Sequence, residues 1–135
     1  MHPTYLDLAA SCTPSELVKE LSKEQIKQQI LGETTGYTGR FNHDVAHGFH
    51  KMYPLLENPD YEPKPRDSIA SRAEKEDRDP YEYAYEVLLA NNGKGLIFFP
   101  LADFAEHTLD PTYERLNHHG AFWSLSDGGA HCRLI

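Results

Sequence analysis

The residues best suited to chemistry lie together near the end of the sequence, in the stretch "SLSDGGAHCRLI". Asp127 follows an apolar run that predicts a strand, and in α/β folds functional groups gather at the carboxyl ends of strands. Gly128 and Gly129 let the backbone turn sharply near a ligand, and His131 follows them. A carboxylate in this position can bind a metal or act as a base. A second interpretation is equally open, in which Asp127 caps a turn and the glycines only shape it.

A run of three histidines is the second set of candidate ligands. His43, His47 and His50 stand at i, i+4 and i+7, so on a helix they share one face and could bind zinc or nickel. Solvated histidines explain the same spacing more simply, because residues 33–43 predict a loop that leads into only a short helix near residues 45–53.

Composition limits the classes of function. The chain has 135 residues, 39% hydrophobic and 25% charged, which is typical of one soluble globular domain or a piece of one. Its net charge of −8 opposes nucleic-acid binding, which needs clustered Lys and Arg. No apolar run approaches the roughly 20 residues that cross a bilayer, and no signal peptide is evident. We therefore expect a cytoplasmic protein without membrane or nucleic-acid partners.

The first half of the chain predicts helices. Thr13-Pro14-Ser15-Glu16 is a capping box that begins a helix reaching about Leu31, and the segment Ser22–Gln25 repeats the box, which would divide that helix in two. Four prolines in residues 54–66 predict an extended connector.

The second half predicts strands as well as helices. Asp67 is expected to cap a helix through about Lys75, and Asp79-Pro80-Tyr81-Glu82 opens another that ends at Asn92-Gly93. The continuous apolar run 95–101 predicts a strand buried on both faces, Asp110 caps a helix to about His118, and residues 121–126 predict a further strand. Together these elements predict one βαβ unit, which lacks the neighbouring strands that a stable parallel sheet needs.

The string Ser126-Asp127-Gly128-Gly129-Ala130-His131, with residues 58–116, resembles the C-terminal part of the amidohydrolase superfamily, in the branch of the N-acyl-D-amino-acid deacylases. The resemblance covers about residues 54–132, and the first fifty residues more loosely. The resemblance implies an α/β fold that is the C-terminal portion of a (β/α)8 barrel, also called a TIM barrel, with its last two parallel strands at 95–101 and 121–126. It implies a helical segment over the barrel mouth (1–53), the proline-rich connector (54–66), and helices plus the βαβ unit (67–135). A chain with only this portion is an incomplete barrel.

The same resemblance implies a function and a set of site residues. Enzymes of this branch are zinc-dependent hydrolases that cleave the amide of N-acyl amino acids. Asp127 matches their metal-site carboxylate and general base, and His131, Gly128 and Gly129 become substrate-side candidates. The His-x-His pair of the family's first strand is not in this sequence.

This count of ligands decides what we expect of the chain alone. Catalytic zinc usually has three protein ligands, and Asp127 supplies at most one, so we expect the isolated chain to bind no zinc and to be inactive. A complementing barrel fragment from another polypeptide is one way to complete the site. The alternative function is a non-catalytic, self-associating helical interaction protein derived from that family, in which unpaired strand edges form a homodimer or larger oligomer.

Overall fold

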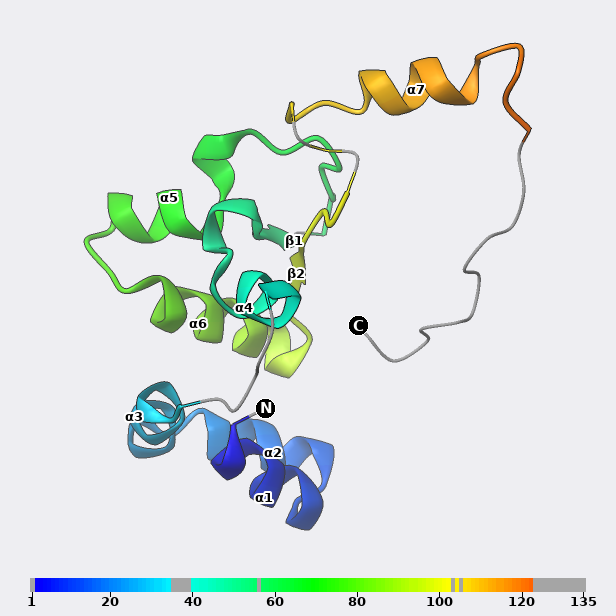
Figure 1. Cartoon of the computed structure of the whole chain (residues 1–135). Coiled ribbons are helices and arrows are strands. Elements are labelled where there is room, and N and C mark those ends of the chain that lie inside the picture. Colours follow the sequence, from blue (N-terminus) through cyan, green and yellow to red (C-terminus); the bar gives the residue numbers. More distant parts are fainter. Residues whose placement is uncertain (1, 35–39, 56, 103, 105, 123–135) are drawn as a thin grey trace. The chain divides into compact units, whose positions relative to one another are not determined.

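The computed structural model describes residues 2–34, 40–55, 57–102, 104 and 106–122, which belong to two compact units, residues 1–100 and 101–135 (Figure 1). Most of the described residues are helical. The elements in chain order are α1 (Pro3–Ser11), α2 (Pro14–Leu21), α3 (Glu24–Gly32), α4 (Arg40–His47), η1 (Phe49–Lys51), β1 (Tyr53–Leu55), η2 (Pro65–Asp67), α5 (Ile69–Lys75), α6 (Pro80–Gly93), β2 (Leu96–Phe98) and α7 (Asp110–Leu116).

The first three helices pack on one another, and the predicted signal at the start of α2 is confirmed, whereas Ser22 does not cap α3, whose N-cap is Lys23. The capping box at Thr13 is confirmed, because the Thr13 side chain accepts from the Glu16 backbone and the Glu16 side chain accepts from the Thr13 backbone. The predicted division is also confirmed, since α2 ends at Leu21 and α3 begins at Glu24. Helix α1, which the sequence did not predict, is tied to the end of α3 where the Thr4 backbone N–H donates to Glu33 Oε1 at 3.1 Å.

A small apolar core lies between the middle elements of the first unit. Its buried members are Phe49, Met52, Ile69 and Ala84, from η1, the residue before β1, α5 and α6. Ile69 is 0% exposed, and its backbone N–H donates to the Met52 carbonyl at 2.7 Å. Helix α5 is capped by Ser68, one residue later than the predicted Asp67, which lies in η2. The core therefore fixes η1 and β1 against α5 and α6.

Helix α6 begins at the predicted cap and ends in a left-handed turn. The Asp79 side chain accepts from the backbones of Tyr81 and Glu82. At the other end Asn91 and Asn92 have φ of 53° and 59° and Gly93 has φ of 75°, a conformation that Asn and Gly tolerate best. Gly95 follows, and a Cβ there would lie 1.7 Å from the Val87 carbonyl oxygen. The chain can turn back against α6 at this point because residue 95 has no side chain.

The described residues contain one sheet, and it corrects the predicted fold class. β1 and β2 pair antiparallel, with Tyr53 opposite Phe98 and Leu55 opposite Leu96. The expectation of two parallel barrel strands in an α/β fold is therefore wrong. The apolar run 95–101 was interpreted as a strand buried on both faces, but Leu96 is 47% exposed and the strand ends at Phe98, two residues before Pro100. A short two-stranded antiparallel ribbon has one open face, so the absence of alternation was misleading.

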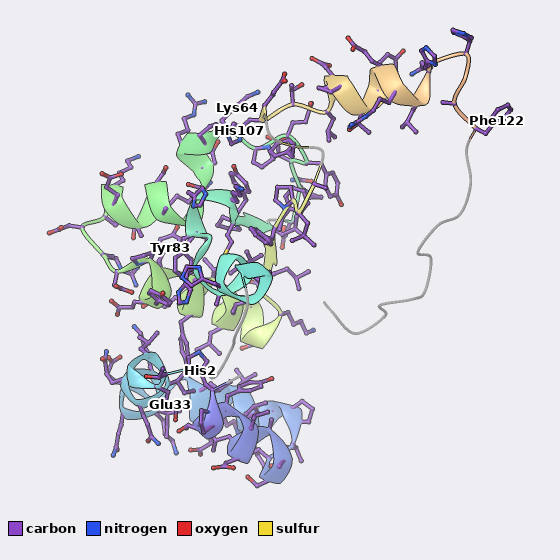
Figure 2. The ribbon with its side chains drawn as sticks, in the orientation of Figure 1. His2, Glu33, Lys64, Tyr83, His107 and Phe122 are labelled. Carbon is purple, nitrogen blue, oxygen red and sulfur yellow. The ribbon has the colours of Figure 1, made fainter. Side chains whose placement is uncertain are left out.

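The second unit is described from Leu101 to Phe122, apart from residues 103 and 105. Its helix α7 covers most of the predicted 110–118 segment, but Asp110 is the first helical residue rather than the cap. The predicted strand 121–126 is not seen at its first two positions: Ala121 and Phe122 have no strand geometry, and Phe122 is 93% exposed (Figure 2). Residues 123–126 lie outside the described residues.

An ion-pair cluster joins α3 to α6 inside the first unit. Lys27 is 8% exposed, and its Nζ donates to Glu82 Oε1 at 2.5 Å and to Glu86 Oε1 at 2.9 Å. Arg78 binds the other oxygen of Glu86 at 2.5 Å. The hydrogen bond to Glu82 raises the pKa of Lys27, and the hydrogen bonds from Arg78 and then Lys27 lower the pKa of Glu86. One nearly buried cation therefore binds two carboxylates of α6, and Lys27 and Arg78 together balance their charge.

Replacing Lys27 should destabilise the fold. Lys27→Met leaves Glu82 and Glu86 close together without the cation between them, and we expect the free energy of unfolding to fall by about 1–2 kcal/mol, because both carboxylates are partly solvated. Urea denaturation followed by circular dichroism measures this. Lys23→Met is the matched control: Lys23 pairs with Glu20 at the surface, 58% exposed, and its loss should cost less than about 0.5 kcal/mol. Equal losses for the two variants contradict the structural role of the cluster.

The same cluster predicts loss of stability in acid. The pKa of Glu86 in the folded chain lies below its ordinary value of 4.5, so this carboxylate contributes stability above pH 4.5 and loses it as the pH falls through the folded-state pKa. The raised pKa of Lys27 keeps its contribution in place up to at least pH 10.5. The urea midpoint should therefore fall below about pH 4.5, and less steeply in Glu86→Gln. Glu57→Gln, on the exposed connector, should keep the wild-type slope.

Candidate functional site

The candidate residues at the end of the chain are not placed by the structure. Asp127, Gly128, Gly129 and His131 lie outside the described residues, so their catalytic, metal-binding and substrate-side roles stay predictions. Within the part of the chain that is described, no group of three or more His, Cys, Asp or Glu side chains is arranged to hold a metal ion.

The histidine run is on an element boundary rather than on one helix. Helix α4 ends at His47, and Gly48 leaves helical geometry with ψ of 41°. His50 therefore belongs to η1, so the three imidazoles do not share one helical face. His43 and His47 remain one turn apart on α4, and their ring centroids are 4.4 Å apart with planes tilted by 49°. Both side chains are exposed.

Tyr81, from the first turn of α6, completes this group. Its hydroxyl and His47 Nδ1 are joined by a short hydrogen bond, and the two rings meet edge to face with centroids 5.7 Å apart. The tyrosine ring also meets the buried Phe49 edge to face, with centroids 4.6 Å apart. The Asp79 cap fixes the Tyr81 backbone, since Asp79 Oδ1 accepts from the Tyr81 N–H at 2.8 Å. We call His43, His47 and Tyr81 the imidazole–phenol cluster.

The neighbouring tyrosines of α6, Tyr83 and Tyr85, make contacts with other residues. The Tyr85 hydroxyl donates to the Leu21 carbonyl at 2.8 Å and so joins α6 to α2, and burial raises its pKa. Tyr83 lies under the guanidinium of Arg78, 5.5 Å from ring centroid to Cζ. The bond between Tyr81 and His47 was missed because 34 residues separate them and no local pattern signals the contact.

A second pair of histidines lies in the other unit. His118 and His119 are adjacent and exposed, with ring centroids 4.3 Å apart. The backbone N–H of Gly120 donates to His118 Nδ1 at 3.1 Å, so this nitrogen is already an acceptor. A neutral imidazole has one acceptor nitrogen and one N–H, so this bond leaves His118 without a second lone pair for a ligand.

Comparison with protein-family models, curated proteins and solved structures finds no match to this chain. None of the helices in the described residues has both the length and the apolar character needed to cross a bilayer.

Proposed function

We propose that this chain supplies the general-base carboxylate of a metal-dependent hydrolase that cleaves amide C–N bonds of N-acyl amino acids, and that it is inactive alone. The observation that carries the proposal is the string Ser126-Asp127-Gly128-Gly129-Ala130-His131. It is similar to the corresponding string of the N-acyl-D-amino-acid deacylases and places a carboxylate before two glycines. The proposal assigns no barrel to these residues, because β2 pairs antiparallel with β1.

The proposal requires further metal ligands from outside these 135 residues. The described residues do not offer zinc a set of three ligands, so we derive no step through a metal from them. The role of the chain is confined to Asp127. In amide hydrolysis the Asp127 carboxylate takes a proton from the attacking water and passes it to the leaving nitrogen as the C–N bond breaks. The products are the carboxylic acid and the free amino acid. Gly128, Gly129 and His131 are the residues that we assign to the substrate side.

A complementation experiment tests the role of Asp127. An N-acyl-D-amino-acid deacylase truncated before its own Asp-Gly-Gly segment is coexpressed with this chain, and zinc-dependent hydrolysis of N-acetyl-D-amino acids is measured. We expect turnover with the wild-type chain, none with either polypeptide alone, and a loss of about 10²–10⁴-fold in kcat with Asp127→Asn, which is what a general base contributes. Asp110→Asn, on an exposed aspartate of α7, is the matched control. Zinc-dependent turnover by the isolated chain, or an unchanged rate with Asp127→Asn, contradicts the proposal.

One observation favours the second candidate, a self-associating interaction protein. Helix α7 buries none of its residues, and Leu109, Tyr113 and Leu116, spaced four and three residues apart, are 38%, 68% and 44% exposed. This spacing places them on one helical face. An apolar face of this kind fits the same face of a second copy of the chain, as in a two-fold symmetric dimer.

Sedimentation equilibrium measures this association. If α7 pairs with its copy, the apparent mass should rise with concentration, and Tyr113→Glu should shift the chain toward monomer because a charge replaces an apolar contact. Glu114→Gln, at the neighbouring exposed position, should leave the mass profile unchanged. A monomer at all concentrations excludes this candidate without bearing on Asp127.

A further inference from the structure

The imidazole–phenol cluster combines features of a metal site that do not depend on Asp127. We infer that His43 and His47 bind one divalent transition-metal ion of the copper, nickel and zinc class, and that Tyr81 orients His47 for it. The inference is independent of the proposed hydrolase and uses only described residues.

The distance between the two rings fits a shared ion. Metal–nitrogen distances of about 2.0–2.1 Å place two ring centres roughly 4.5 Å apart when the imidazoles bind at right angles, as on copper or nickel, and roughly 5.2 Å apart on a tetrahedral zinc ion. The observed separation of the His43 and His47 centroids is 4.4 Å, with planes tilted by 49° rather than stacked. Because His43 and His47 stand at positions i and i+4 of one helix, the helix itself keeps the two rings close together, and no other segment of the chain has to move.

The hydrogen bond between Tyr81 and His47 is compatible with the tautomer that a metal needs, because a phenol oxygen can accept as well as donate. A histidine ligand commonly donates the N–H of its other nitrogen to an oxygen acceptor, which fixes the ring and leaves one lone pair for the ion. When His47 Nδ1–H donates to the Tyr81 hydroxyl oxygen, His47 Nε2 has its lone pair directed away from that bond. Phe49 contacts the tyrosine ring and Asp79 binds the Tyr81 backbone N–H, so both the ring and the backbone of Tyr81 have a partner.

The chemistry of the donors sets the class of ion. Neutral imidazole suits copper, nickel and zinc, whereas calcium and magnesium require oxygen ligands. Two protein ligands leave positions for water on an ion at an exposed site. Binding to both rings also links successive turns of α4, so the ion should stabilise this helix.

The pair at His118 and His119 provides an internal comparison. Its ring separation is similar, but Gly120 N–H occupies the acceptor nitrogen of His118, so binding there would first break that hydrogen bond. A contribution from proximity alone would appear equally at both pairs. A contribution from the hydrogen bond to Tyr81 would appear only at His43 and His47.

Isothermal titration of the 135-residue chain with CuCl₂, NiCl₂ and ZnCl₂ tests the inference. We expect about one equivalent of saturable metal binding, with an affinity at least 10-fold lower in His43→Gln and in His47→Gln. In Tyr81→Phe the affinity should be about 10-fold lower, because His47 loses the hydrogen-bond partner that orients it. His50→Gln and the double variant His118→Gln/His119→Gln should bind as the wild type does. Unchanged affinity in both His43→Gln and His47→Gln, or loss in the His118/His119 variant instead, overturns the site. Unchanged affinity in Tyr81→Phe overturns its positioning role.

A second measurement needs no variant and so cannot be confused by misfolding. Zinc added to the ¹⁵N-labelled wild-type chain should shift the ring nitrogen resonances of His43 and His47, and those of His47 should report metal on Nε2 with a proton on Nδ1. Shifts confined to other histidines, or metal on His47 Nδ1, contradict the proposed arrangement.

Discussion

The arrangement of the first unit depends on the ammonium group of Lys27. The first three helices bury few apolar side chains: α1 buries none, and Leu21 and Ile30 are the buried apolar residues of α2 and α3. Apolar contact between these helices and α6 therefore rests on few side chains. Lys27 adds a polar link, because it is nearly buried and binds two carboxylates on α6. Its long apolar stem packs against the helices while its charge is neutralised at the tip.

A second constraint, the apolar core, determines where the imidazole–phenol cluster forms. Phe49 is buried in that core and follows directly on the end of α4, so the last turn of α4 has to lie beside α6. Phe49 also contacts Tyr81 edge to face. The same side chain therefore brings His47 to Tyr81 and supports the tyrosine ring. A polar contact at the surface is positioned by an apolar residue beneath it, which is how exposed side chains acquire a defined geometry.

Local signals predicted the starts of α2 and α6, but they missed α1 and placed a helix near residues 45–53 where α4 spans Arg40–His47. They carried no information about nonlocal strand pairing. The capping residues Thr13 and Asp79 marked two helix starts because a cap is a contact within four residues. The partner of β2 is β1, more than 40 residues earlier, and the apolar run 95–101 contains nothing that distinguishes a parallel neighbour from an antiparallel one. The sequence identified His43 and His47 by spacing but not Tyr81, whose role depends on tertiary contact. Asp127 was found from a motif, and the structure does not describe its surroundings.

Imidazole tautomers explain why ring proximity alone does not define a site in this chain. His43 with His47, and His118 with His119, have nearly equal ring separations. The two pairs differ in the group that is hydrogen-bonded to the imidazole. A backbone N–H can only donate, whereas a phenol hydroxyl can donate or accept. Gly120 therefore consumes the lone pair of His118, while Tyr81 can accept the proton of His47 and leave the opposite nitrogen basic. The two histidine pairs therefore differ by one acceptor oxygen, the Tyr81 hydroxyl on α6. Asp79 binds the Tyr81 backbone and Phe49 contacts its ring, and a metal bound at His47 would disturb neither contact.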